Sequence, residues 1–497
     1  LLLAADLPNR RWFRAKSRRI RDVEIVQATP VSHDGDGTVR FVLLLIDANF
    51  DRGPSERYAM PLTFVTGDRA AEIERHQPDQ VIGELVVDGT EGLLVDATVE
   101  AGFAYAALDF VGRRRQLPVG PGRLVGVPTP AFRRVTEGLG EEPSVVALGA
   151  DQSNTSLGIG NRVVVKLLRR IEEGINPDVE IGRFLSERAK FPNSPQIAGH
   201  LEYREGHGLS SASTVVVVEQ LVENEGDGWN YVLDALTRGL EEVVAKAGDR
   251  APKASVPASI FDAARSENPA DDLLVGPHLQ WAELLGARTA ELHLALASRH
   301  ERAFEPEPLG PIDRHAMVHA ARSLLRRSIR DGRASRGAHP FLDEILEREA
   351  EIRARLDAVR QVTKAGSKIR VHGDFHLGQV LWTGKDFVPI DFEGEPARPL
   401  ATRRLKRPAL VDVAGMVRSF DYAARMAATR LNRDLLASRD PARIDPLLSS
   451  WYRWVAGSFL RSYFTTAQGA EFLPDADEDR RALLEFALLE KAIYEVG

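Results

Sequence analysis

The sequence predicts an α+β fold with a β-rich part over residues 1–222 and a helical part over residues 223–497. In the first part, short apolar runs bounded by Gly, Pro and Asp recur, as expected for strands. In the second, apolar residues recur at helical spacing, over 229–247, 278–297, 340–362, 411–429, 447–465 and 479–495. A chain of 497 residues, 43% hydrophobic and 28% charged, is long enough for two or three compact units.

Residues 1–95 carry β-like segments, which we expect to form a small sheet: 20–27, 39–46, 57–62 and 80–87. Residues 11–16, which precede these segments, are expected to form a helix before the sheet. This region contains no cluster of residues suited to catalysis, so a packing or interface module is the preferred interpretation. A helix from Val99 to about Ala107 should follow.

Residues 96–222 predict a second β-rich part, in which strands 143–148 and 162–168 flank a small polar turn. Backbone N–H groups and hydroxyls in such a turn can cover nucleotide phosphates, although most turns of this kind are only turns. The candidate phosphate-binding residues are Ser153, Asn154, Thr155 and Ser156.

Lys166 ends the apolar run 163–165, where a buried ammonium group needs a partner. Glu180 lies on a predicted helix with Pro177 in its first turn. A strand lysine paired with a helix glutamate fixes nucleotide phosphates in kinases. We therefore predict that Lys166 and Glu180 belong to a nucleotide site.

A third candidate nucleotide contact lies after the buried strand 214–218. The backbone of Glu219, Gln220 and Val222 follows that strand and precedes a polar break, where main-chain groups would be free to meet an adenine.

Two apolar segments, 368–371 and 386–390, predict strands, and an acidic residue follows each of them. A hairpin-like return between them would bring Asp374 and Asp391 together. Phosphoryl transfer needs one carboxylate to accept the proton of the acceptor hydroxyl and another to bind Mg²⁺. We assign Asp374 the first role and Asp391 the second, with the amide oxygen of Gln379 as a further magnesium ligand.

Two of these assignments have alternatives. His372, Asp374 and His376 are also spaced to ligate a transition metal, but a metallohydrolase would leave Lys166 unexplained and ranks last. Asp412 precedes an apolar helical pattern, so it either caps that helix or braces the catalytic loop from a buried position.

Composition excludes several classes of partner. The net charge of -7 argues against nucleic acid, because phosphate neutralisation needs a dense basic face. The absence of cysteine excludes disulfides and thiolate metal sites and fits either a reducing compartment or one in which oxidation makes no difference to the protein. No apolar run approaches the roughly 20 residues of a membrane helix. We expect a cytoplasmic protein that binds neither nucleic acid nor membrane.

The motifs at 372–379 and 391–396 together resemble the signature of the maltokinases, relatives of the aminoglycoside phosphotransferases with a protein-kinase-like fold. The similarity extends to Arg11-Trp12-Phe13, the turn 153–155, Lys166, Glu180 and the segment 412–420. The resemblance implies a bilobal fold with an N-terminal cap subdomain at 1–95, a β-rich intermediate subdomain at 96–222 and a helical C-lobe at 223–497.

The resemblance also implies an activity, namely transfer of the γ-phosphate of ATP, with Mg²⁺, to the anomeric hydroxyl of maltose. Maltose 1-phosphate made in this way would feed glycogen (α-glucan) synthesis from trehalose. Trehalose synthase would then be a partner, fused or in complex, and the start at Leu1 agrees with a domain taken from such a fusion. The residues expected to contact the sugar are His376, Glu393, Arg418, Tyr422 and Tyr494.

Two other functions stay open. One is a kinase for another sugar or amino sugar, such as glucosamine, and the other is a catalytically silent scaffold for trehalose synthase. The sequence also departs from the family, because the connection 224–275 is long and the chain stops at Gly497. If a longer tail helps to close the sugar site, this chain should bind its substrate less well.

Overall fold

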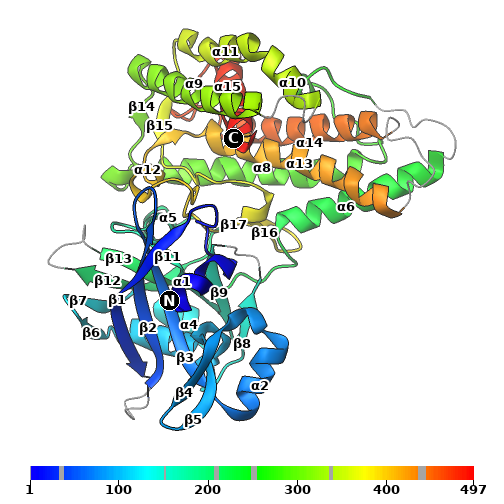
Figure 1. Ribbon diagram of the computed structural model, residues 1–497. Coiled ribbons are helices and arrows are strands. Elements are labelled where there is room, and N and C mark those ends of the chain that lie inside the picture. Colours follow the sequence, from blue (N-terminus) through cyan, green and yellow to red (C-terminus); the bar gives the residue numbers. More distant parts are fainter. Residues whose placement is uncertain are drawn as a thin grey trace. The chain divides into compact units, whose positions relative to one another are not determined.

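The computed structural model describes residues 2–32, 39–149, 153–205, 212–247, 255–334, 340–434 and 444–496. The chain divides into two compact units (Figure 1). Unit 1 comprises Leu1–Ser186, Pro195–Glu223 and Pro396–Thr402, and unit 2 comprises Glu187–Ser194, Asn224–Glu395 and Arg403–Gly497. Among the described residues, no helix has both the length and the apolar character needed to cross a membrane.

Unit 1 begins with an antiparallel sheet of strand order β1-β2-β3-β5-β4, and the short strand β11 (Arg170–Ile171) pairs with β3. The other strands are β1 (Ile20–Ser32), β2 (Val39–Phe50), β3 (Glu56–Val65), β4 (Val81–Val87) and β5 (Thr90–Asp96). Successive residues of β2 face opposite sides of the sheet. Leu43 and Leu45 join the core that contains helix α3 (Ala101–Gly112), whereas Leu44 and Ile46 pack with Trp12.

Unit 1 also contains a seven-stranded antiparallel sheet of order β6-β7-β12-β13-β10-β9-β8. Its strands are β6 (Gln116–Val119), β7 (Gly122–Pro128), β8 (Val145–Leu148), β9 (Asn154–Ile159), β10 (Val163–Leu168), β12 (Ile197–Glu205) and β13 (Ala212–Gln220). Strand β10 is buried along its whole length because it pairs on both sides. The short helices of this unit are α1 (Leu2–Asp6), α2 (Gly67–His76), α4 (Phe132–Thr136) and α5 (Pro177–Arg183).

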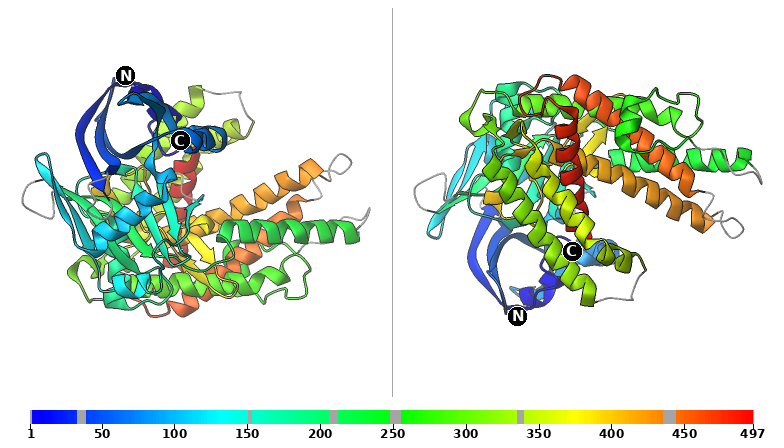
Figure 2. Two further views of the ribbon diagram at one scale, coloured as in Figure 1. Left: turned by 90° about the horizontal axis from the view of Figure 1, so that it is seen from below. Right: turned by 90° about the horizontal axis from the view of Figure 1, so that it is seen from above.

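Unit 2 is mainly helical and has one large apolar core. Helix α14 packs against α8, and α15 packs against α13. Figure 2 shows the red helix α15 crossing the direction of the orange helix α13. The helices are α6 (Gly228–Ala247), α7 (Ile260–Arg265), α8 (Gly276–Leu296), α9 (Pro311–Ala334), α10 (Pro340–Glu347), α11 (Glu349–Ala358), α13 (Leu410–Asp434), α14 (Asp445–Thr466) and α15 (Asp477–Val496).

Two small sheets complete unit 2. Strands β14 (Glu307–Pro308), β15 (Ser367–Ile369) and β18 (Arg407–Pro408) form one, and the hairpin of β16 (Val380–Trp382) and β17 (Phe387–Pro389) forms the other. Strands β15 and β17 confirm the two strand predictions around the central motif. The hairpin that returns the chain before Asp391 is formed by β16 and β17, whereas β15 pairs with β14 and β18.

Most predicted elements are confirmed, but near the N-terminus one prediction is wrong and one strand was missed. The run 11–16 is not helical, and Trp12, Phe13 and Ala15 are buried in the core cluster that also contains Leu44 and Ile46, so tertiary packing overrides a weak helical pattern there. Strand β5 was not predicted. It pairs with β3 and β4 across most of its length, and such pairing overrides a weak local pattern.

Candidate active site

The loop that carries Asp374 is held by a carboxylate from helix α13. Asp412 is fully buried, and its two oxygens accept hydrogen bonds from the backbone N–H groups of His372 (2.7 Å) and Gly373 (2.9 Å). Its Oδ2 also lies 3.2 Å from Nε2 of His293, whose Nδ1 contacts the hydroxyl of Tyr463 at 2.9 Å. Asp412 therefore braces the loop that carries Asp374 from a buried position, which was one of its two predicted roles.

The same contacts explain why Asp412 stays ionised. Burial alone would raise the pKa of this carboxyl, but the hydrogen bonds from His293 and from the backbone of Gly373 hold the pKa below its usual value. A charged acceptor forms stronger hydrogen bonds with backbone N–H groups than a neutral one. The loop is thus anchored by a charge-assisted contact inside the core.

His372 links this loop to the strand that precedes Asp391. Its Nε2 donates to the carbonyl oxygen of Ile390 at 2.8 Å, and its ring packs between the rings of Phe375 and Phe392. Because the side chain is almost completely buried and fixed in this way, it serves the loop's geometry and is not placed to ligate a metal.

The hairpin β16–β17 places the two predicted magnesium ligands side by side. The amide Nε2 of Gln379 donates to Oδ2 of Asp391 at 3.0 Å. Asp391 has a φ of +63°, a left-handed conformation that is uncommon outside glycine and that concentrates at functional sites. A carboxylate and an amide that lie together offer the hard oxygen ligands that Mg²⁺ prefers, once the amide turns its oxygen inward.

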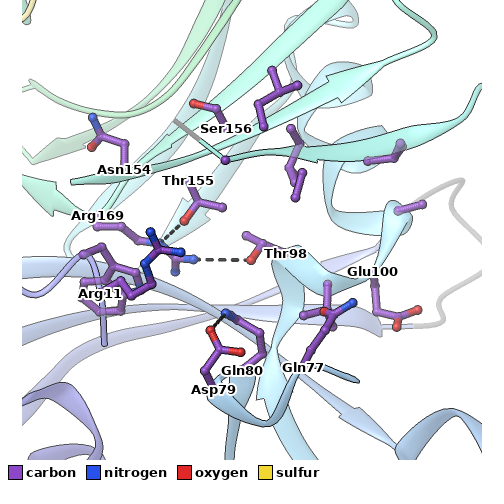
Figure 3. Close-up of a pocket in the computed structure, with 18 of the residues that line it drawn as sticks. Arg11, Gln77, Asp79, Gln80, Thr98, Glu100, Asn154, Thr155, Ser156 and Arg169 are labelled. Carbon is purple, nitrogen blue, oxygen red and sulfur yellow. Dashed lines mark hydrogen bonds between the residues drawn. The ribbon is translucent and has the colours of Figure 1, made fainter. Parts of the chain in front are cut away.

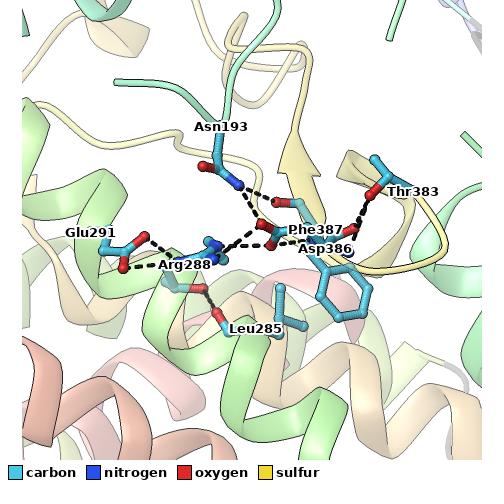
Figure 4. A network of polar contacts seen from close by, with 8 residues as sticks. Asn193, Leu285, Arg288, Glu291, Thr383, Asp386 and Phe387 are labelled. Atoms are coloured by element: carbon cyan, nitrogen blue, oxygen red, sulfur yellow. Dashed lines mark hydrogen bonds and ion pairs between the residues drawn. The ribbon is translucent and has the colours of Figure 1, made fainter. Parts of the chain in front are cut away.

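The same hairpin is clamped to helix α8 (Figure 4). Asp386, at the start of β17, accepts two hydrogen bonds from Arg288, at 2.7 and 3.0 Å, and a third from Asn193 at 3.0 Å. Arg288 also binds Glu291 one turn along α8. The clamp could not be found from the sequence, because Arg288 and Asn193 are separated from Asp386 by 98 and 193 positions along the chain.

Asp374 is half-buried and faces helix α15. Nζ of Lys491 lies 3.6 Å from Oδ1 of Asp374 and 3.8 Å from Oε2 of Glu395. Nε2 of His376 lies 4.0 Å from Oδ2 of Asp374. Sequence reasoning missed Lys491, since a lysine on an amphipathic helix is normally a solvated surface residue.

Helices α13 and α15 gather the other predicted sugar contacts. Arg418 donates to Oε2 of Glu495 at 2.8 Å and to Asp421 at 3.0 Å, and the hydroxyl of Tyr422 donates to the same Glu495 oxygen at 3.0 Å. Glu495 lies one helical turn after Lys491, so both occupy one face of α15. Tyr494 places its ring 5.6 Å from Nζ of Lys491.

Glu393, the remaining predicted sugar contact, is buried. Its Oε2 lies 4.0 Å from Nη1 of Arg403, which also donates to the carbonyl oxygen of Glu393 at 3.3 Å. A nearby cation thus balances the charge of this carboxylate.

In unit 1, Lys166 is buried on β10 and has a carboxylate partner that was not predicted. Its Nζ lies 3.2 Å from Oδ2 of Asp178, in the first turn of α5. Asn176 caps that helix by accepting from the backbone N–H groups of Asp178 and Val179. Glu180 is half-buried in the same turn. The predicted helix with Pro177 in its first turn is confirmed. The pairing of Lys166 with Glu180 stays a prediction, and Asp178 joins the candidate nucleotide residues.

The predicted phosphate-binding turn requires a correction. Asn154, Thr155 and Ser156 lie in strand β9, which pairs with both β8 and β10. Ser153 precedes that strand, and residues 150–152 of the predicted turn region lie outside the described residues.

The predicted adenine contacts also change. Glu219 and Gln220 belong to β13 and are paired with β10, and the N–H of Gln220 donates to the carbonyl oxygen of Gln196 at 2.9 Å. Val222 lies beyond the end of the strand. Of the three residues, only Val222 lies in the segment that joins β13 to α6 along the chain.

Comparison with known proteins shows similarity in sequence and in fold. The family model of the maltokinase N-terminal cap domain matches residues 7–99. A glucosamine kinase of Streptacidiphilus jiangxiensis is 28% identical over 321 residues, which cover 64% of this chain and 61% of that protein. The chain thus spans about three fifths of the length of this curated relative.

Solved structures give the fold. A glucosamine kinase (crystal form B) aligns with a TM-score of 0.62 and 20% identity over 100% of this chain and 93% of that chain. A glucosamine kinase in complex with glucosamine, ADP and inorganic phosphate aligns with a TM-score of 0.57 and 22% identity, over 96% of this chain and 89% of that chain.

The fold is therefore that of the glucosamine kinases, which confirms the predicted kinase-like α+β class with an N-terminal cap. The match of residues 7–99 to the maltokinase N-terminal cap domain agrees with the resemblance that the sequence predicted.

Proposed function

We propose that this protein is an ATP-dependent sugar kinase that phosphorylates maltose at its anomeric hydroxyl, giving maltose 1-phosphate and ADP. The observation that carries the proposal is the loop anchored by Asp412, which presents Asp374 while the adjoining hairpin holds Gln379 against Asp391. Phosphoryl transfer depends on positioning and charge neutralisation, and this arrangement supplies both.

In the proposed reaction, Asp374 orients the acceptor hydroxyl and takes its proton as the oxygen attacks the γ-phosphate of ATP. Asp412 and His372 keep the loop in place, so Asp374 does not have to be ordered during the reaction. Lys491 balances the charge of Asp374 and Glu395 before the substrate binds. Lys166, held by Asp178, neutralises charge on the nucleotide phosphates.

Gln379 and Asp391 would hold Mg²⁺, a cofactor that kinases of this fold require. The fit is supported by their hard oxygen donors, their close approach and the left-handed backbone of Asp391. The ion would shield phosphate charge while the β–γ bond breaks.

Maltose as the sugar is supported by the match of residues 7–99 to the maltokinase N-terminal cap domain. The candidate sugar residues carry charges of both signs, since Arg418 is shared by Glu495 and Asp421 and Lys491 is shared by Asp374 and Glu395.

Glucosamine phosphorylation is the second candidate, since the curated relative and both solved structures are glucosamine kinases. Beyond the reaction itself, we propose that the maltose 1-phosphate feeds α-glucan synthesis from trehalose, with trehalose synthase as the partner.

The test measures ADP formation from Mg·ATP with maltose, glucose, glucosamine and an aminoglycoside, each in a separate assay. We expect the highest kcat/KM for maltose and an acid-labile anomeric phosphate in the product. A higher kcat/KM for glucosamine would replace maltose by the second candidate. No ADP formation with any of the four sugars would contradict the proposed activity.

A further inference from the structure

Unit 1 contains a cavity of about 620 Å³ on the cap side of the seven-stranded sheet (Figure 3). The cap contributes one wall, β8 and β9 contribute another, and the segment 98–101 lies between them. A volume of this size suits a small organic ligand. The polar and charged residues that line it are Arg11, Arg69, Gln77, Asp79, Gln80, Thr98, Glu100, Asn154, Thr155, Ser156 and Arg169.

The arginines of this cavity differ in their partners. Arg169 pairs with the buried Asp96 at 2.7 Å, and Arg69 binds Glu100, also at 2.7 Å. Arg11 is exposed and has no hydrogen-bond or ion-pair partner within the described ranges of the chain. Arg11 is therefore the lining cation whose charge is available to a ligand.

The backbone of Arg11 is nevertheless fixed. Its neighbours Arg10 and Trp12 are buried. The guanidinium of Arg10 donates to the carbonyl oxygens of Asp79 and Val81, the second at 3.1 Å, which ties this segment to the residues that form the rest of the cap wall. A free guanidinium on a fixed segment is a suitable phosphate ligand, because its planar fork forms two parallel hydrogen bonds.

The rest of the cap wall suits a polyhydroxylated molecule. Gln77, Asp79 and Gln80 present planar amide and carboxylate groups, which can donate to and accept from sugar hydroxyls. The hydroxyl of Thr155 accepts a hydrogen bond from Arg169 at 2.9 Å and retains its own proton for a ligand. The lining thus combines one anion-binding group with several hydroxyl-binding groups.

Strand β9 connects this cavity with the candidate nucleotide residues. Ser156 lies opposite Lys166 in the β9–β10 register, and Thr155 lies opposite Leu167. Residues opposite each other share a face of the sheet, and successive residues alternate. Ser156 therefore stands on the face that carries Lys166, whereas Thr155 stands on the face that carries Arg169. A ligand that binds Thr155 would therefore contact β9, the strand whose Ser156 lies opposite Lys166.

We propose that the cavity is an effector site for a phosphorylated sugar, with Arg11 binding the phosphate and the cap wall binding the hydroxyls. Occupancy of the site alters the affinity for ATP through β9, by stabilising one position of that strand. The binding half of this proposal is independent of the proposed kinase activity, whereas the effect on ATP rests on it.

The experiment titrates the full chain with glucose 1-phosphate, glucose and inorganic phosphate by calorimetry, using wild type, Arg11→Ala and Arg11→Lys. Arg14→Ala is the matched control, because Arg14 is exposed on the same segment but does not line the cavity. We expect glucose 1-phosphate to bind wild type and Arg14→Ala equally, at least tenfold more weakly to Arg11→Ala, and with intermediate affinity to Arg11→Lys.

Equal affinity of wild type and Arg11→Ala, or no binding to wild type, would overturn the proposal. Inorganic phosphate that binds as tightly as glucose 1-phosphate would overturn the assignment of a sugar ligand. Arg11-dependent binding in a protein that phosphorylates no sugar would support the site and refute only the proposed kinase activity. An ATP affinity that is the same with and without glucose 1-phosphate would overturn the coupling through β9.

Discussion

The carboxylate of Asp412 lies 2.7 Å from the backbone nitrogen of His372, although 40 residues separate the two in the sequence. The anchor comes from the first turn of a long helix and holds the loop by its backbone, so the loop's side chains remain available for chemistry. The position of Asp374 thus depends on a residue that is buried in the core.

Replacing Asp412 tests whether the position of Asp374 depends on this contact. Asp412→Asn would leave one backbone N–H facing an amide N–H group inside the core, at a cost of about 2–3 kcal/mol in the free energy of unfolding. We also expect kcat to fall more than tenfold with little change in KM for ATP, because the loop would no longer be fixed. Asp445→Asn, on an exposed residue at the start of α14, is the control. An Asp412→Asn protein with normal kcat would contradict the positioning role.

Lys491 offers a test of the sugar side of the site. Lys491→Met removes the cation shared by Asp374 and Glu395, so the two carboxylates would repel each other without compensation. We expect kcat/KM for the sugar to fall about tenfold or more, while the free energy of unfolding changes by less than about 1 kcal/mol, since the side chain is partly exposed. Lys491→Arg should restore part of the activity. If Lys491→Met had wild-type kcat/KM, Lys491 would be only a surface residue.

The clamp between Arg288 and Asp386 is expected to stabilise the folded protein. Arg288→Ala removes two charge-assisted hydrogen bonds to Asp386 and two to Glu291. The carboxylate of Asp386 keeps the hydrogen bonds from Asn193 and from the backbone N–H of Phe387 (Figure 4). The expected loss is about 1–2 kcal/mol of unfolding free energy, measured by chemical denaturation. Arg299→Ala, which breaks a largely exposed ion pair with Glu471, should cost only about 0.5 kcal/mol. Equal losses in the two variants would show that the clamp contributes no more than a surface pair.

The lowered pKa of the buried His278 leads us to expect that the protein loses stability in acid. Burial lowers the pKa of His278 to about 4 from an ordinary value of 6.5, and its Nδ1 accepts a hydrogen bond from Nε1 of Trp281 at 3.1 Å. Because the folded pKa is depressed, the unfolded chain binds the proton more readily. The stabilisation is therefore complete above pH 6.5 and is lost as the pH falls toward 4, by up to about 3 kcal/mol.

Denaturation curves between pH 7 and 4 check this prediction. His278→Gln keeps an acceptor for Trp281 but does not titrate, so its stability should fall less over this range than that of wild type. His315→Gln, on an exposed histidine of α9, should behave as wild type does. The prediction is wrong if wild type and His278→Gln lose the same stability.

Local patterns predicted much of the fold. The apolar run before Lys166 and the proline after Asn176 were sufficient for β10 and α5, because strand propensity and helix capping act over a few residues. The short strands on either side of the central motif were predicted for the same reason.

The identity of distant partners could not be predicted from the sequence. Asp178 beside Lys166, Lys491 beside Asp374 and Glu495 beside Arg418 are pairings that the fold creates. Their local patterns are those of ordinary helix termini and faces, so no short-range signal distinguishes them. The assignment of Asn154 to Ser156 to a turn failed similarly, because pairing with β10 makes this polar stretch a strand.

The role of Asp374 is tested most directly by the turnover of Asp374→Asn with maltose and Mg·ATP, measured beside the dissociation constant for ATP. We predict a kcat lower by a factor of about 10² to 10⁴ and an ATP dissociation constant within about twofold of wild type, because the base acts only in the transfer step. A kcat close to that of wild type would contradict the assignment of Asp374 as the base, and with it the proposed mechanism.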